Sequence, residues 1–319
     1  MSALIAVVGP TATGKSALGL ELAGAFNGEI VACDSTAVYR GLDIGTDKMA
    51  PADQRGIPHH LVDVADPSET YSAARYAADA GAAIHDIVRR GRLPILVGGT
   101  GFYYRALVRG LFPGPARSDT TRDRLERVAA ARGVEFLHRW LGRVDPESAQ
   151  RILPRDRQRM VRALEVYLLT GRPLTSHFAQ TVSVITGFDV LLLGVNLPRP
   201  LLLERVARRV DEQFARGVVR EVEGLLARGL PASAHALRGL VYRQVVEMIQ
   251  GARDEAGTRE LIVRENMRYA RQQLTWFRKE PGIQWLDGAG EADAARHRAH
   301  ELARDFVERS VRPVEDCVR

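Results

Sequence analysis

The apolar residues of the chain fall into two patterns, short runs and longer stretches with helical spacing. Short apolar runs predict buried strands at residues 3–8, 29–33, 94–97 and 188–196 and a final strand ending near Trp285. Helical periodicity predicts helices at residues 16–26, 72–90, 102–108, 201–216 and 258–279. Because strand, loop and helix alternate with short connections, we predict an α/β fold with a parallel sheet covered by helices.

The middle of the chain departs from this alternation. Residues 118–169 are almost wholly helical in pattern, with breaks at Gly133, Pro146 and Pro154. A Gly- and Pro-rich stretch, 110–115, precedes them and is typical of a linker. We therefore predict a core domain formed by residues 1–115 and 186–319, with C-terminal helices, and an all-helical insertion domain at 116–185.

The composition is that of an ordinary soluble globular protein. Of the 319 residues, 45% are hydrophobic and 26% are charged. No apolar run is long enough to span a membrane, and the first residues lack the layout of a signal peptide. With only Cys33 and Cys317, the chain has no disulfide framework and no zinc cluster. We expect a cytoplasmic protein that does not bind membranes.

Residues 9–16, Gly-Pro-Thr-Ala-Thr-Gly-Lys-Ser, have the spacing of a phosphate-binding loop. The motif follows a predicted strand and precedes a predicted helix, so its backbone N–H groups and the helix N-terminus can surround an anion. Lys15 supplies a positive charge, and the hydroxyl of Ser16 can bind Mg²⁺. The alternative is a tight turn with these residues by chance. The motif indicates a phosphate-containing ligand without specifying ATP.

The second predicted strand ends at Asp34, beside the phosphate loop. In α/β folds ligands bind at the carboxyl ends of the strands, so Asp34 is a candidate functional residue, although capping the next turn is a common role for Asp. A histidine pair, His59 and His60, enters another short predicted strand near Asp63. Its spacing matches no common metal-ligand set, so we expect a structural role for the pair.

Arginine is concentrated in the predicted insertion. The whole chain has a net charge of +6, and residues 117–172 contain thirteen Arg, no Lys and eight acidic residues. Arg155, Arg159 and Arg162 form one stripe on a predicted helix. Such a stripe can be a solvated face, or it can contact phosphates and bases, which arginine binds better than lysine does. The pattern alone leaves both readings open.

Two further basic groups lie in the C-terminal half. Arg205 and Arg209, one helical turn apart, can clamp a diphosphate or can be surface residues. Residues 271–279 interleave basic and aromatic residues, as nucleic-acid strands favour. Trp276 and Phe277 can equally belong to the core.

Eight motifs between Gly9 and Trp285 together resemble those of the tRNA dimethylallyltransferases (isopentenyltransferases). They are the phosphate loop at 9–16, Asp-Ser-x-x-Val-Tyr at 34–39, Asp-Ile-Gly-Thr-x-Lys at 43–48, Pro-His-His-Leu-x-Asp at 58–63, Gly-Gly-Thr-Gly-x-Tyr at 98–103, Gln-Arg-x-x-Arg-Ala-Leu-Glu at 158–165, Arg-Val-Asp at 209–211 and Gln-Leu-Thr-Trp at 273–276. Gln213 departs from the usual pattern after Arg209. The absence of a zinc-finger extension makes the chain similar to the bacterial members.

The resemblance implies a P-loop NTPase-like fold and a prenyl transfer. A dimethylallyl group would pass from dimethylallyl diphosphate to the exocyclic N6 amine of the adenosine 3′ of the tRNA anticodon, releasing diphosphate, with Mg²⁺ as cofactor. The helical insertion would bind the anticodon arm, and we expect a monomer. Asp34 would be the general base, Thr100 its hydrogen-bonding partner, and Lys15 a further catalytic residue.

The same resemblance implies two sets of binding residues. The diphosphate would be bound by Gly9, Thr11, Ala12, Thr13, Gly14, Lys15, Ser16, Arg205 and Arg209. The tRNA would be bound by Asp34, Ser35, Thr36, Ala37, Gln158, Arg159, Arg162, Arg238, Tyr242, Arg243, Arg271, Gln273, Thr275, Trp276 and Arg278.

Two other functions stay open. A P-loop small-molecule kinase would use ATP, with Asp34 activating a hydroxyl and the Arg205–Arg209 pair serving the γ-phosphate. An RNA-binding protein with a vestigial phosphate loop is the third possibility, and the intact Gly14-Lys15-Ser16 argues against it.

Overall fold

The computed structural model describes residues 2–311 and divides into two compact units. The core unit comprises Met1–Val108 and Val184–Arg319, and the helical unit comprises Arg109–Ser183. Cys317 and the rest of the C-terminal tail lie outside the described residues.

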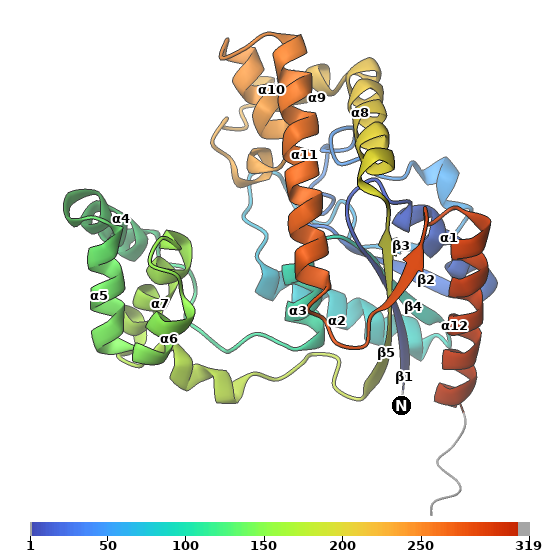
Figure 1. Cartoon of the computed structure of the whole chain (residues 1–319), viewed down its shortest axis with the longest axis horizontal. Coiled ribbons are helices and arrows are strands. Elements are labelled where there is room, and N and C mark those ends of the chain that lie inside the picture. Colours follow the sequence, from blue (N-terminus) through green and yellow to red (C-terminus); the bar gives the residue numbers. More distant parts are fainter. Residues whose placement is uncertain (1, 312–319) are drawn as a thin grey trace, which may run out of the picture. The chain divides into compact units, whose positions relative to one another are not determined.

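The core unit is built on a six-stranded sheet (Figure 1). Its strands lie in the order β3-β2-β4-β1-β5-β6 and are all parallel. Their bounds are β1 Ser2–Val8, β2 Gly28–Cys33, β3 His59–His60, β4 Leu93–Gly98, β5 Phe188–Asn196 and β6 Gln284–Asp287. The α/β class predicted from the alternating pattern is confirmed.

Both faces of the sheet are buried, which explains why its central strands are unbroken apolar runs. Successive side chains of a strand point to opposite faces. Leu4, Ala6 and Val8 of β1 pack in one cluster with helices α2 (Ala73–Arg89) and α3 (Gly101–Val108). Ile5 and Val7 pack in the other cluster with α1 (Lys15–Ala25) and α12 (Asp293–Val311).

Four more helices complete the core unit beyond the sheet. They are α8 (Arg199–Arg216), α9 (Val218–Ala227), α10 (Tyr242–Ile249) and α11 (Glu255–Phe277). We predicted α8 and α11 to within a turn and did not predict α9 or α10. Leu202 and Val206 of α8 pack against Ala270 of α11 in a small apolar cluster. Short 3₁₀ segments lie at Pro51–Gln54 and His235–Arg238.

The helical unit contains α4 (Asp119–Arg132), α5 (Val134–Val144), α6 (Pro146–Arg151), α7 (Arg157–Thr170) and a 3₁₀ segment, Leu174–Gln180. The breaks lie where Gly133 and the two prolines were expected. We expected residues 110–115 to be a linker outside the insertion. They instead join the helical unit, because Leu111 forms an antiparallel bridge with Val182 and Arg162 donates to the carbonyl of Pro115 at 3.0 Å.

A buried carboxylate organises the helical unit. Glu165, fully buried in α7, accepts hydrogen bonds from Arg122 at 2.9 Å, from Arg162 at 2.8 Å and from the N–H of Ser118 at 2.8 Å. Burial by itself raises the pKa of Glu165, but these hydrogen bonds outweigh it, so the pKa is lowered and the group stays ionised. Glu165 therefore fixes α4, α7 and the segment before α4 to one another.

We expect Glu165→Gln to destabilise the helical unit by about 3 kcal/mol, because it leaves two half-buried guanidinium groups without a counter-charge. Because the pKa of Glu165 is lowered on folding, the wild type also loses stability as the pH falls below the ordinary glutamate value. Urea unfolding followed by amide hydrogen exchange in α4 and α7 measures the change. Glu147→Gln, which breaks an exposed pair with Arg151, is the control and should cost under about 1 kcal/mol. Equal losses in the two variants would contradict the role of Glu165.

Candidate functional site

The phosphate loop links the end of β1 to the start of α1. Gly9 has a φ of +142° and Gly14 a φ of +87°, both unfavourable for residues with a side chain. A Cβ on Gly9 would lie 2.3 Å from the carbonyl oxygen of Val195 in β5, so no other residue fits there. The buried Thr13 hydroxyl donates to the carbonyl of Pro10 at 2.9 Å and closes the loop from within.

The loop borders a cavity of about 260 Å³, here named the anion cavity. Its lining is Ala12, Thr13, Gly14, Lys15, Ser16, Asp47, Arg205, Arg208, Arg209 and Glu212. Lys15 turns its ammonium group back to the carbonyl of Pro10. Burial, together with the charge of Arg209, lowers the pKa of Lys15 to about 7, while Asp34 opposes the shift. Four cationic side chains facing two acidic ones make the cavity suited to a polyanion.

The two candidate arginines of α8 are held differently. Arg209 donates to the hydroxyl of Thr11 at 3.1 Å and to the carbonyl of Thr46 at 3.2 Å, and pairs with Asp47 at 3.1 Å. Arg205 pairs with Glu291 at 2.5 Å. Arg209 is thus tied directly to the phosphate loop and shares the carboxylate of Asp47 with Arg216, whereas Arg205 is paired with Glu291.

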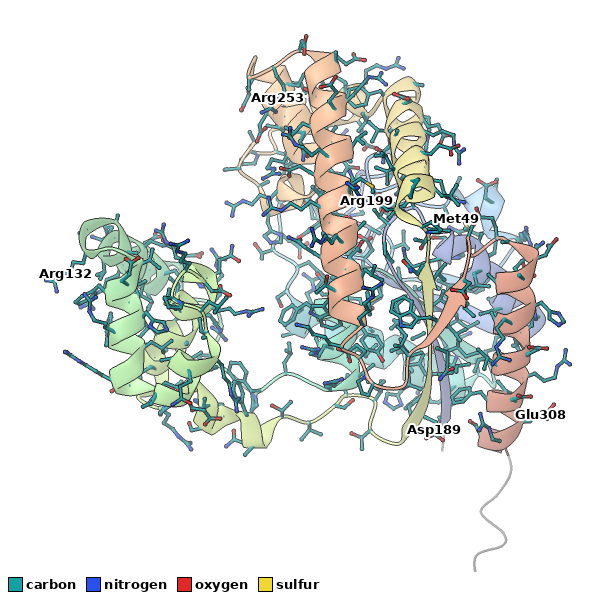
Figure 2. The ribbon with its side chains drawn as sticks, in the orientation of Figure 1. Met49, Arg132, Asp189, Arg199, Arg253 and Glu308 are labelled. Atoms are coloured by element: carbon teal, nitrogen blue, oxygen red, sulfur yellow. The ribbon has the colours of Figure 1, made fainter. Side chains whose placement is uncertain are left out.

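Two other cavities adjoin the anion cavity. The outer cavity, about 200 Å³, is lined by Thr36, Val206, Gln213, Gly239, Val241 and Asn266 among others. The inner cavity, about 180 Å³, has an apolar side formed by Ile30, Ala32, Met49, Val62 and Val97; Figure 2 labels Met49. Asp34 lines both the outer and the inner cavity. Arg209 lines all three cavities and so lies where they meet.

The two carboxylate oxygens of Asp34 differ in the hydrogen bonds that they accept. Oδ1 accepts the N–H of Thr36 at 2.8 Å, its hydroxyl at 2.6 Å and the N–H of Ala37 at 3.2 Å. Asp34 therefore does cap the following turn, and this fixes its carboxylate. Among residues 2–311, no side-chain or backbone group hydrogen-bonds to Oδ2, which leaves that oxygen able to accept a proton.

Among residues 2–311, Thr100 does not form the hydrogen bond to Asp34 that we expected. Its hydroxyl oxygen accepts the N–H of Ser35 at 3.1 Å, and its own N–H donates to the carbonyl of Cys33 at 3.1 Å. Thr100 lies just after β4, the strand next to β2, which ends immediately before Asp34. Its side chain reaches the backbone of Ser35 rather than the carboxylate of Asp34. Thr100 thus positions the chain on both sides of Asp34.

Two of the residues expected to bind tRNA are buried. Gln273 accepts the N–H of Thr11 at 3.0 Å and donates to the carbonyl of Gly99 at 2.8 Å, so both ends of its amide hold the loops of the site. Tyr242 is fully buried and donates to Glu221 at 2.7 Å. Tyr242 therefore supports the site from within, whereas Gln273 both joins the loops and lines the inner cavity.

The remaining expected residues of this set lie nearer the surface. Trp276 is half-buried, packs against Gly101 and has the guanidinium of Arg105 4.3 Å above its ring. Ser35, Thr36 and Ala37 are half-buried; Ser35 and Thr36 line the outer cavity, and Ala37 lines the inner one. The exposed ones in the core unit are Arg238, Arg243, Arg271, Thr275 and Arg278, and those in the helical unit are Gln158 and Arg159. Arg162 is held by Glu165, as described above.

The sequence analysis missed Glu221 and Val241. Glu221 accepts the N–H groups of Asp43, Ile44 and Gly45 at 2.9, 2.8 and 3.3 Å and so fixes the loop that carries Thr46 and Asp47. Val241 is buried beside the outer cavity with a φ of +75°, which is strained for a β-branched residue. No local pattern marks Glu221, because the N–H groups that it accepts belong to residues distant in sequence. None marks the positive φ of Val241 either.

The histidine pair is anchored within the core unit. His60 hydrogen-bonds to the buried Glu29 at 2.7 Å, and His59 to the carbonyl of Ile57 at 2.8 Å. Hydrogen bonds from Arg90 lower the pKa of Glu29 to about 2, so it stays charged. Within residues 2–311, no group of three or more His, Cys, Asp or Glu side chains is arranged to hold a metal ion.

Comparison with known proteins assigns the chain to a family. A family model described as IPP transferase matches residues 37–280. The chain belongs to the IPP transferase family. This confirms the membership that the eight motifs predicted.

Curated IPP transferase relatives match nearly the whole chain. The tRNA dimethylallyltransferase of Acidothermus cellulolyticus is 48% identical over 91% of this chain and 90% of its own length. The tRNA dimethylallyltransferase 1 of Trichlorobacter lovleyi is 45% identical over 89% of this chain and 93% of its own.

Solved IPP transferase structures share the fold. The full-length tRNA isopentenylpyrophosphate transferase of Bacillus halodurans has a TM-score of 0.73 at 34% identity, covering 97% of this chain and 98% of its own. A eukaryotic dimethylallyltransferase, described as acting on tRNA, has a TM-score of 0.80 at 27% identity. The match covers 99% of this chain and 82% of that protein. None of the helices in the described part of this chain is long and apolar enough to cross a membrane.

The lowered pKa of Lys15 predicts proton uptake on anion binding. Above about pH 7 the free lysine is largely neutral, and a bound diphosphate should raise its pKa, so affinity should fall as the pH rises. At about pH 8 we expect uptake of roughly one proton per inorganic pyrophosphate, measured by calorimetry in buffers of different ionisation enthalpy. Lys15→Arg, which stays charged, controls for protons exchanged by pyrophosphate itself. The same proton uptake in the wild type and in Lys15→Arg would contradict the assignment of that uptake to Lys15.

Proposed function

We propose that this chain is a tRNA dimethylallyltransferase. It transfers a dimethylallyl group from dimethylallyl diphosphate to the exocyclic N6 amine of the adenosine 3′ of the tRNA anticodon. The observation that carries the proposal is the junction of the three cavities at Arg209, with Asp34 at the boundary of two of them. One cavity is suited to an anion, one has an apolar side for a short hydrocarbon, and one opens towards an acceptor.

The anion cavity binds the diphosphate. Backbone N–H groups of the phosphate loop and the N-terminus of α1 surround it, and Lys15 and Arg209 supply positive charge. The bond that breaks joins C1 of the dimethylallyl group to a diphosphate oxygen, and negative charge develops on that oxygen. Lys15 and Arg209 stabilise this charge in a partly buried cavity, where the interaction is stronger than in bulk water.

The chain also fits a Mg²⁺ ion bound together with the diphosphate. Ser16 is exposed, and it lines the anion and inner cavities beside Lys15. Mg²⁺ retains several waters and takes few protein ligands when substrate phosphates complete its shell, so one hydroxyl is a sufficient protein contribution. When bound, the ion would neutralise charge on the leaving diphosphate.

Asp34 accepts the proton of the nucleophile. As the adenosine N6 atom bonds to C1, its proton passes to Oδ2 of Asp34, because Oδ1 is already saturated by Thr36 and Ala37. The hydrogen bonds to Oδ1 hold the carboxylate in one orientation towards the cavities. Proton transfer to a positioned base of this kind contributes about 10²–10⁴ to a rate.

The acceptor adenosine must leave its stack to enter the outer cavity, at a cost of a few kcal/mol. Contacts between the RNA and exposed arginines of the core unit, Arg238, Arg243, Arg271 and Arg278, offset this cost. Since the phosphate loop, Asp34 and Arg209 all come from one chain, the proposal requires only a monomer.

The experiment that tests this function is incubation with Mg²⁺, labelled dimethylallyl diphosphate and unmodified tRNA, with labelled ATP in parallel. We expect label on the tRNA and no ATP turnover. ATP consumption without prenyl transfer would replace the proposal with the small-molecule kinase.

Asp34→Asn removes the proposed base but keeps an oxygen that can cap the following turn. The amide oxygen can still accept the N–H of Thr36, so the fold and tRNA affinity should persist. We expect the single-turnover rate of prenyl transfer to fall by about 10²–10⁴. A rate within about threefold of wild type would remove Asp34 from the role of base.

Arg209→Gln and Arg205→Gln decide which arginine clamps the diphosphate. We expect a loss of about 10²–10³ in kcat for Arg209→Gln, because its charge faces the leaving group. Arg205→Gln should lose under about tenfold, because Glu291 neutralises that guanidinium, whereas the carboxylate that pairs with Arg209, Asp47, is shared with Arg216. Steady-state kinetics with varied dimethylallyl diphosphate measure both, and the reverse ranking would assign the clamp to Arg205.

A further inference from the structure

The turn between β6 and α12 packs directly against the outside of the phosphate loop. The N–H of Gly290 donates to the carbonyl of Thr13 at 2.8 Å. A Cβ on Gly290 would overlap the carbonyl oxygen of Gly14, so only glycine allows this close approach. Helix α12 packs in the same apolar cluster as α1, which keeps the turn against the loop. Residues 288–291 therefore form part of the surroundings of the phosphate loop.

The residue after Gly290, Glu291, places a carboxylate at the start of α1. Its Oε2 lies within the volume that a Cβ on Gly14 would occupy, so the carboxylate rests against the backbone of Gly14. Gly14 is the N-cap of α1, and in the part of the chain that the structure describes no side chain caps this helix. The N-terminus of a helix favours a negative charge. Glu291 thus brings a negative charge, from a distant segment, to the helix end that borders the anion cavity.

The same carboxylate pairs with an arginine of the anion cavity. Oε1 of Glu291 lies 2.5 Å from the guanidinium of Arg205, and Arg205 lines that cavity. The side chain of Arg205 is 20% exposed and that of Glu291 is 43% exposed, so the ion pair stands at the edge of the cavity. A diphosphate in the anion cavity therefore meets the positive charge of Arg205 together with an opposing charge directly behind it.

Transfer of the dimethylallyl group raises the negative charge of the bound anion. The bond between C1 and the diphosphate oxygen breaks with its electron pair on that oxygen, and the proton of N6 passes to Asp34. The diphosphate left in the cavity thus carries one more negative charge than the same group carried in the substrate. A carboxylate beside the cavity repels this product more strongly than it repels the substrate. The position of Glu291 therefore favours departure of the diphosphate.

We propose that Glu291 limits the affinity of the anion cavity for diphosphate and thereby favours release of the diphosphate product. The inference rests on the proposed function and goes beyond it by assigning a role in product release to the turn before α12. The alternative role for Glu291 is to hold Arg205 in the orientation that binds the diphosphate. The two roles predict effects of opposite sign, because the carboxylate opposes anion binding in the first and supports it in the second.

Binding of inorganic pyrophosphate to the full-length protein distinguishes the two roles. The variants are Glu291→Gln, Arg205→Gln and the double variant that combines them. The matched control is Asp293→Asn, which makes the same change in net charge as Glu291→Gln. Asp293 pairs with Arg296, and its side chain is 96% exposed. Titration calorimetry with Mg²⁺ present gives the dissociation constant of each protein at low and at high salt.

Glu291→Gln should bind pyrophosphate about tenfold more tightly than the wild type at low salt, because it removes a charge of the same sign beside the ligand. This gain should shrink at about 0.5 M salt, since the ion pair is partly exposed and is screened. Arg205→Gln should bind less tightly than the wild type. The double variant should return to within about threefold of the wild type, because two opposing charges are removed together. Asp293→Asn should match the wild type.

Enzyme kinetics extend the test to product release. Pyrophosphate should inhibit prenyl transfer by Glu291→Gln at about tenfold lower concentration than it inhibits the wild type. The affinity for dimethylallyl diphosphate should rise by a smaller factor, because the substrate carries less charge. The single-turnover rate should not fall, since removal of a carboxylate does not oppose the charge that develops on the leaving oxygen.

Weaker pyrophosphate binding or slower single turnover in Glu291→Gln would overturn the proposal and identify Glu291 as the residue that orients Arg205. Unchanged binding would also overturn it, because the carboxylate would then have no effect on the cavity. Thermal unfolding near the wild-type temperature shows that each variant is folded, and Glu291→Ala replaces Glu291→Gln if the latter does not fold. Failure of the wild type to transfer a dimethylallyl group would refute the proposed function, whereas pyrophosphate binding needs no transfer and still tests Glu291.

Discussion

The site depends on two basic side chains, Lys15 and Arg209, that lie close together in a partly buried cavity. Burial, together with the charge of Arg209, lowers the pKa of Lys15 to about 7. Arg209 stays in place because Asp47, Thr11 and the carbonyl of Thr46 hold it. These contacts therefore fix the donors of Arg209 at the edge of the anion cavity, an arrangement that favours binding of an anion.

Much of the architecture around this cavity is arranged by carboxylates that face backbone N–H groups. Glu221 orders the loop carrying Asp47 by accepting three successive N–H groups. Asp34 orders its own turn in the same way, with one oxygen, and keeps the other free for chemistry. Gln273 does the equivalent with an amide, joining Thr11 to Gly99. Positions remote in sequence thus set the geometry of the phosphate loop and of the candidate base.

In the helical unit, the number of arginines does not show which of them are available to a ligand. Its arginine excess is visible in the composition, but carboxylates such as Glu165 neutralise part of it inside the unit. Five exposed arginines of α4 and α5 form no ion pair with a carboxylate of residues 2–311, and two of them, Arg132 and Arg139, have guanidinium groups 4.9 and 6.0 Å from the ring centre of Phe136. The function of an arginine here depends on whether folding brings a carboxylate to it.

The sequence by itself determined the strand and helix alternation, the phosphate loop and the family, because these depend on local periodicity and on residues spaced closely along the chain. The parallel sheet followed from that alternation. Tertiary structure alone decided that Thr100 supports the backbone at Ser35, that Tyr242 is buried against Glu221, and that Arg162 is tied to Glu165. Each of these depends on a partner that sequence spacing does not specify, since a hydrogen bond or ion pair forms only where folding brings two distant side chains within about 3 Å.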